Sequence, residues 1–138
     1  MVNPIEELIL FNKLSEETTL LGRKVKWHTL DGEEYAQALS STPTYDDVTR
    51  LQLLKIEKLA RAIDSIDGQT WVSLIPQDKQ NEIKPTQKAR ETISKWQRSV
   101  IDFFYFKFEQ LESKSNKILE DLEKNFQLSL TNSASSGK

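Results

Sequence analysis

Residues 85–126 read PTQKARETISKWQRSVIDFFYFKFEQLESKSNKILEDLEKNF, and they carry the strongest structural signal in the sequence. After Pro85 it contains neither glycine nor proline. Apolar side chains recur in it at gaps of three and four residues, which is the spacing of one face of an α-helix. They are Ala89, Ile93, Trp96, Val100, Phe103 or Phe104, Phe108, Leu111, Ile118, Leu122 and Phe126. The pattern predicts one long C-terminal helix over about 85–126.

The middle of this predicted helix carries more aromatic surface than a single stripe can hold. Residues 103–108 read FFYFKF, so some of the rings must face away from the seam that packs on the rest of the protein. Aromatic side chains dominate interface energetics, and large apolar patches rarely stay exposed on a monomer. We therefore predict a partner-binding surface, with the alternative that these rings are the thickest part of the core. The candidate residues are Trp96, Phe103, Phe104, Tyr105, Phe106, Phe108 and Leu111.

The N-terminal part of the chain predicts one helix and one strand. Asn3, Pro4 and Glu6 suit the start of a short helix that runs through Leu14, although an extended strand is an alternative there. Residues 23–30 alternate apolar with polar side chains, which is the period of a half-buried strand. The polar face of this strand is basic, which favours an edge position in the sheet.

Two helices are expected between this strand and the C-terminal helix. Asp31, followed by Glu34 three residues later, predicts a helix over about 31–40. Thr44 begins a longer predicted helix over 44–67, which ends at Gly68, where glycine can adopt the left-handed cap.

The remaining segments complete the predicted organisation. Residues 69–84 are expected to form a linker anchored by Trp71, or a short strand that pairs with residues 23–30. Residues 129–138 are rich in Ser and Asn and are expected to form a flexible tail. The predicted fold class is mainly α with a small β element, in one domain over residues 1–128 that ends in the long helix.

Composition argues against several classes of partner and site. With 19 Lys and Arg against 21 Asp and Glu, the net charge is -2, so there is no general attraction to nucleic acid or to anionic lipid. Glu91, Asp102 and Glu109 interrupt the lysines and aromatics around residues 95–108, so we expect no nucleic-acid groove there. The longest apolar run is far shorter than the about 18 residues of a membrane span. No secretory signal is expected, because acidic residues replace its basic start.

No catalytic, cofactor or metal site is predicted. The chain has no cysteine, which excludes disulfides and thiolate ligands and suits a reducing compartment. His28 is the only histidine, so neither a His–His metal pair nor a conventional triad can form, and we expect it to be an ordinary surface residue. Acidic pairs such as Glu33 and Glu34 lie near predicted first turns, where negative charge favours the helix dipole.

Three segments resemble a known family. Residues 22–35 read GRKVKWHTLDGEEY, residues 59–68 read LARAIDSIDG, and the aromatic run extends from Trp96 to Leu111. In this order they are similar to the small tail-assembly chaperones of tailed bacteriophages, and the resemblance covers residues 22–126.

The resemblance implies a non-enzymatic protein of the host cytoplasm that acts while the phage tail or baseplate is built. It implies binding to the tape-measure protein or a baseplate hub component, together with self-association. One alternative is a structural subunit that remains in the virion tail or baseplate. A second alternative is a helical regulator or nucleic-acid-binding protein.

Overall fold

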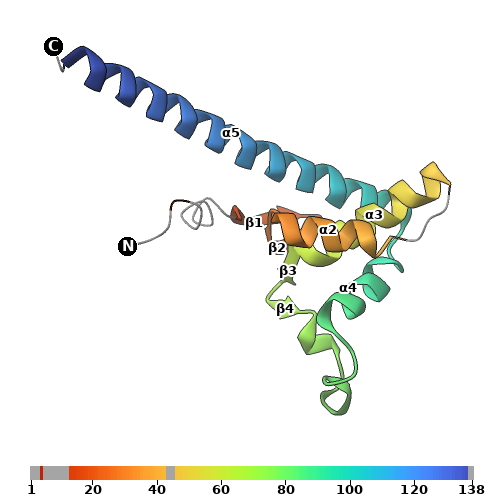
Figure 1. Ribbon diagram of the computed structural model, residues 1–138. Coiled ribbons are helices and arrows are strands. Elements are labelled where there is room, and N and C mark those ends of the chain that lie inside the picture. Colours follow the sequence, from red (N-terminus) through yellow and green to blue (C-terminus); the bar gives the residue numbers. More distant parts are fainter. Residues whose placement is uncertain (1–3, 5–12, 43–45, 137–138) are drawn as a thin grey trace.

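The computed structural model describes residue 4 and residues 13–42 and 46–136 (Figure 1). This part of the chain is mainly helical with one small antiparallel sheet, which confirms the predicted fold class. The helix expected over residues 3–14 falls almost entirely outside the described residues.

The sheet has four strands in the order β1-β2-β3-β4. They are β1 (Ser15–Leu20), β2 (Arg23–His28), β3 (Ile63–Ile66) and β4 (Gln69–Thr70), and each pairs antiparallel with its neighbour. The strand expected over 23–30 is therefore confirmed as β2. Its predicted edge position is wrong, because β2 pairs with β1 along one edge and with β3 along the other.

Two tight turns set the register of this sheet. Leu21 and Gly22 join β1 to β2 with φ of 51° and 78°, and Asp67 and Gly68 join β3 to β4 with φ of 51° and 81°. Positive φ at both central residues is the pattern of a type I′ hairpin turn, whose twist matches that of the flanking strands. The second turn also explains why β4 pairs with β3 and not with residues 23–30.

The helix expected over 44–67 is shorter than predicted. Helix α3 (Asp47–Ala62) begins after Asp46, whose side chain accepts a hydrogen bond from the Thr49 amide at 3.0 Å. Thr44, the predicted first residue, lies outside the described residues. The helix ends at Ala62 because the chain becomes extended at Ile63 and pairs with β2 as β3, and Gly68 lies in the hairpin turn that follows.

The other local predictions upstream of residue 85 hold. Helix α2 (Gly32–Ser40) is capped by Asp31, which accepts from the Glu34 amide at 2.8 Å, and the Glu34 carboxylate accepts from the Asp31 amide at 3.2 Å. The linker after β4 contains two short 3-10 helices, η2 (Val72–Leu74) and η3 (Gln77–Lys79). Trp71 anchors it by donating its indole N–H to the Ile63 carbonyl at 2.8 Å.

Two helices replace the single helix expected over 85–126. Helix α4 (Pro85–Ile93) and helix α5 (Arg98–Ser136) take different directions in Figure 1. Short-range turn bonds end α4, among them the Trp96 amide to the Ile93 carbonyl at 2.9 Å. The break lets α4 pack on α3 while α5 crosses the body of the protein. At its other end α5 continues to Ser136, through most of the residues that we expected to form a flexible tail.

The core lies where α3, α4 and α5 meet β2 and β3. Trp27 of β2 is almost fully buried, and its ring centroid lies 6.4 Å from that of Phe104 and 6.3 Å from that of Phe108. Beyond this contact region α5 projects past the other helices and strands of the described part of the chain (Figure 1). The molecule is thus a small body from which one long helix projects.

Candidate protein-binding surface

Three of the predicted partner-binding residues belong to the core. Phe104, Phe108 and Leu111 are each at most 5% exposed. They occupy the face of α5 that lies against the body, and the core of the same domain covers them. For these three side chains the burial agrees with the alternative that the aromatic run is the thickest part of the core, and their contact with a partner stays a prediction.

Two rings of the same run face solvent. Phe103 is 36% exposed and Phe106 is 56% exposed. The ammonium of Lys107 lies 5.7 Å from the Phe103 ring centroid and 6.0 Å from that of Phe106. No ion pair joins Lys107 to a carboxylate within the described residues. These residues form an exposed aromatic and basic patch on the first third of α5.

Trp96 and Tyr105 lie between these extremes, each partly buried at the margin of the core. The Trp96 ring centroid is 5.0 Å from that of Phe104. The Tyr105 hydroxyl accepts a hydrogen bond from the Lys58 ammonium at 3.1 Å, which ties α5 to α3. Both side chains retain an accessible edge beside the core.

A second exposed apolar surface lies farther along α5. Ile118, Leu119, Leu122 and Phe126, here called the distal stripe, follow Leu111 on the same side of the helix as Phe104 and Phe108. Leu122 is half-buried, whereas Phe126 is 55% exposed. The periodicity of the sequence identified most of these positions as part of the apolar face of the helix. It did not indicate where along the helix the contacts with the body of the domain would end.

The boundary between the two parts of α5 is clear in its contacts. Lys114 forms an ion pair with Glu16 of β1, and in the described part of the chain no ion pair links a later residue of α5 to the body. Over residues 116–131 most of the α5 side chains are exposed. The stripe that forms the core up to Leu111 therefore continues into solvent.

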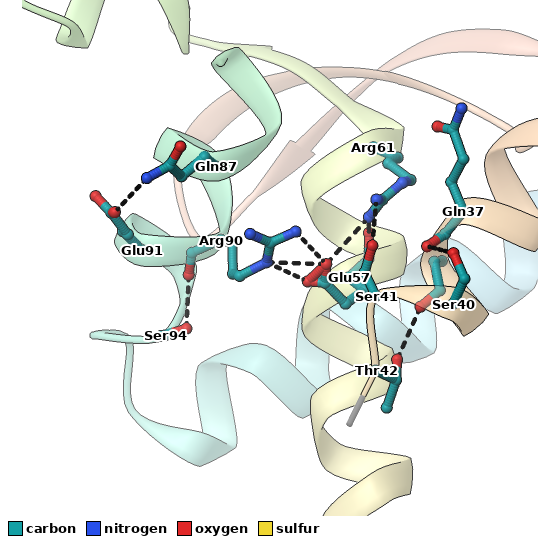
Figure 2. A network of polar contacts seen from close by, with 11 residues as sticks. Gln37, Ser40, Ser41, Thr42, Glu57, Arg61, Gln87, Arg90, Glu91 and Ser94 are labelled. Atoms are coloured by element: carbon teal, nitrogen blue, oxygen red, sulfur yellow. Dashed lines mark hydrogen bonds and ion pairs between the residues drawn. The ribbon is translucent and has the colours of Figure 1, made fainter. Parts of the chain in front are cut away.

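A buried ionic network joins α3 to α4 (Figure 2). The side chain of Glu57 is 4% exposed and accepts hydrogen bonds from Arg90 Nε at 2.9 Å and from a terminal nitrogen of the same guanidinium at 2.7 Å. Arg61 reaches the same carboxylate at 3.3 Å. The hydrogen bonds that Arg90 donates to the Glu57 carboxylate raise the pKa of Arg90 above its already high value. Because its partners lie on the two helices that it joins, we assign this network a structural role.

Sequence reasoning missed this network. Glu57 and Arg61 are spaced i, i+4 on the broad apolar face of α3, and a charged pair at that position is the only available signal. Their partner Arg90 comes from a helix distant in sequence, so the pairing itself cannot be predicted from the spacing.

His28 is not an ordinary surface residue. Its side chain is 12% exposed, with Nδ1 at 2.9 Å from an Asp64 carboxylate oxygen and Nε2 at 3.0 Å from Glu34. The expectation failed because the start of α2 covers this end of β2. Burial would raise the pKa of Glu34, but hydrogen bonds from His28 and Lys13 outweigh it and hold that pKa below its usual value.

Two negative findings apply to residues 13–42 and 46–136. No group of three or more His, Cys, Asp or Glu side chains there could hold a metal ion. None of the helices in that part has the length and apolar character needed to cross a membrane.

Comparisons with protein-family models, with curated proteins and with solved structures gave no match for this chain.

Proposed function

We propose that this protein is a non-enzymatic binding protein whose helix α5 holds a helical segment of another polypeptide. One observation carries the proposal: the apolar face that is core at Phe108 and Leu111 continues as the distal stripe, where no described residue covers it. Exposed apolar patches of this kind mark interaction sites.

The geometry of the stripe suits a helical partner. From Leu111 to Phe126 the helix rises about 22 Å at its standard pitch, which corresponds to about two heptads of a partner helix. Apolar residues at gaps of three and four are the anchors by which one helix packs on another. Binding of a protein, and not of nucleic acid or membrane, also agrees with the net charge of -2.

The setting that we propose is the assembly of a bacteriophage tail or baseplate in the host cytoplasm. It rests on the resemblance of residues 22–126 to tail-assembly chaperones. A chaperone of that kind covers the apolar seam of a long helical client until assembly hides it, which is a role for exposed helix faces and not for a reaction centre. The proposed client is the tape-measure protein or a baseplate hub component, and self-association would use the same stripe.

Co-expression with each candidate client tests the binding proposal. The variant Leu122→Ser/Phe126→Ser should lose the client, because both apolar anchors of the distal stripe are removed. The matched control is Glu120→Ser/Lys124→Ser, which changes exposed residues on the opposite side of α5 and should retain the client. Equal recovery of the client with both variants would contradict the proposal.

A structural subunit of the virion could use the same surface as a permanent interface. Mass spectrometry of purified particles separates the two roles. A chaperone should be missing from the finished particle, whereas a subunit should be present in stoichiometric amount.

A further inference from the structure

An apolar cavity of about 410 Å³ lies between the sheet and the junction of α4 with α5. Its apolar lining comes from the β1–β2 hairpin, from the end of β3 and from the residues around the helix break. The side chains that form this lining are Leu20, Leu21, Ile66, Trp96, Val100 and Phe104. A volume of this size lies within the range of ligand-binding pockets.

Leu21 at the rim of this cavity has an unusual backbone conformation. Its φ is 51°, and its side chain is 63% exposed. The left-handed region is costly for a residue with a branched side chain, and the first position of a type I′ turn prefers Asn, Asp or Gly. The fold therefore keeps an exposed leucine where a polar residue would be more stable, and such local strain is typical of functional sites.

Basic side chains stand beside the cavity. Arg23 contributes to its lining and is 69% exposed while it pairs with Asp67 at 3.0 Å. On α5 the exposed ring of Phe103 lies 6.4 Å from that of Phe104, a lining residue, and the ammonium of Lys107 stacks over Phe103. Lys107 has no carboxylate partner in the part of the chain that the structure describes. The cavity and the aromatic and basic patch thus form one continuous surface.

We propose that this cavity receives an aromatic or branched aliphatic side chain from a partner segment whose neighbouring residues are acidic. The apolar lining favours an apolar anchor, because a polar group there would lose its hydrogen bonds to water without replacement. Arg23 is already paired with Asp67, so it is the charge of Lys107, which has no carboxylate partner among the described residues, that favours acidic neighbours of that anchor. The inference rests on the proposed function, in that the chain binds a protein, and it specifies the chemistry of the bound segment.

The probe that tests the inference is a fluorescein-labelled twelve-residue peptide with one central phenylalanine between aspartates and glutamates. Fluorescence anisotropy with the full chain measures its affinity. Two control peptides replace the phenylalanine by alanine or the acidic residues by lysine. We expect each control peptide to bind at least about tenfold more weakly than the acidic peptide. We also expect added salt to lower the affinity of the acidic peptide for the protein.

Two variants of the protein locate the binding to the cavity. Val100→Trp fills the cavity, and Leu21→Asn removes the apolar rim while it relieves the strained turn. Each variant should lower the affinity for the acidic peptide at least about tenfold with no loss of thermal stability. Lys107→Glu should lower the affinity for the acidic peptide and raise the affinity for the lysine peptide.

The outcomes separate this inference from the proposed function. The distal-stripe variant Leu122→Ser/Phe126→Ser should bind the acidic peptide as the unaltered protein does, although it loses the client. Equal binding of all three peptides, or no effect of both cavity variants, overturns the inference and leaves the proposed function standing. A dimer in sedimentation that Val100→Trp converts to a monomer also overturns it, because the occupant would then be a second copy of this chain.

Discussion

Glu57 is a buried charged residue whose loss should destabilise the fold strongly. It is buried between α3 and α4 and holds two guanidinium groups. Replacement by alanine leaves the buried guanidinium of Arg61 without its carboxylate, and breaking such a buried ion pair costs about 3–5 kcal/mol. We expect Glu57→Ala to lower the free energy of unfolding in urea by about this amount.

The control for this prediction is Glu91→Ala on the exposed side of α4, where the change should stay within about 0.5 kcal/mol. A loss below about 1 kcal/mol for Glu57→Ala would show that the network of Figure 2 contributes little to the joint between the helices.

Leu21 gives a prediction with the opposite sign. Relief of its left-handed backbone by Leu21→Asn should raise the free energy of unfolding by about 1 kcal/mol, because asparagine adopts that conformation at lower cost. Thermal unfolding measures the gain. Thr19→Asn, an exposed change in the neighbouring strand, should bring none. An unfolding temperature lowered by Leu21→Asn would show that the leucine stabilises the hairpin by packing.

Glu34 makes stability depend on pH. Its folded-state pKa is lowered, so its contribution is fully present above the pKa of the unfolded chain, about 4.5, and is lost as pH falls through the folded pKa. We expect Glu34→Gln to be less stable than the unaltered protein at pH 7, with the difference shrinking as pH falls below about 4. Urea unfolding over this pH range measures it. A stability difference between Glu34→Gln and the unaltered protein that stays constant with pH would contradict the lowered pKa of Glu34.

Among the elements, α5 contains two parts that share one apolar face but differ in role. Phe108 lies in the core, and removal of its ring by Phe108→Ala should cost about 3–5 kcal/mol. Phe126 lies beyond the body, and Phe126→Ala should change the free energy of unfolding of the lone protein by less than about 0.5 kcal/mol. Thermal unfolding of the two variants compares them. Similar losses would show that the distal stripe is packed in the monomer.

How far the elements could be predicted depended on the strength of local signals. The capping box of Asp31 and Glu34 and the alternation in β2 are local, so both elements were expected where they occur. The pair Asp67-Gly68 is compatible with both a helix end and a hairpin turn. It forms a hairpin turn here because the preceding segment pairs with β2 as strand β3. The break between α4 and α5 at residues 94–97 contains neither glycine nor proline, so the sequence has no local signal for it. It becomes evident only from the structure, in which α4 packs on α3.

The candidate binding surface could be predicted only in part, because its position also depends on contacts between segments distant in sequence. Periodicity finds the stripe along α5, but consecutive rings such as Phe103 and Phe104 cannot be assigned to core or surface before the position of Trp27 is known. The cavity beside Val100 is formed by segments distant in sequence, so no local pattern indicates it.

The proposed function depends on the overall shape of the described residues, in which one helix projects from a small body with its apolar face uncovered. Hydrogen exchange of the lone monomer, with its state checked by light scattering, measures this directly. Amides of residues 116–130 should exchange far faster than those of residues 101–111 and should become protected when a client binds. Equal protection of both segments in the lone monomer would contradict the account.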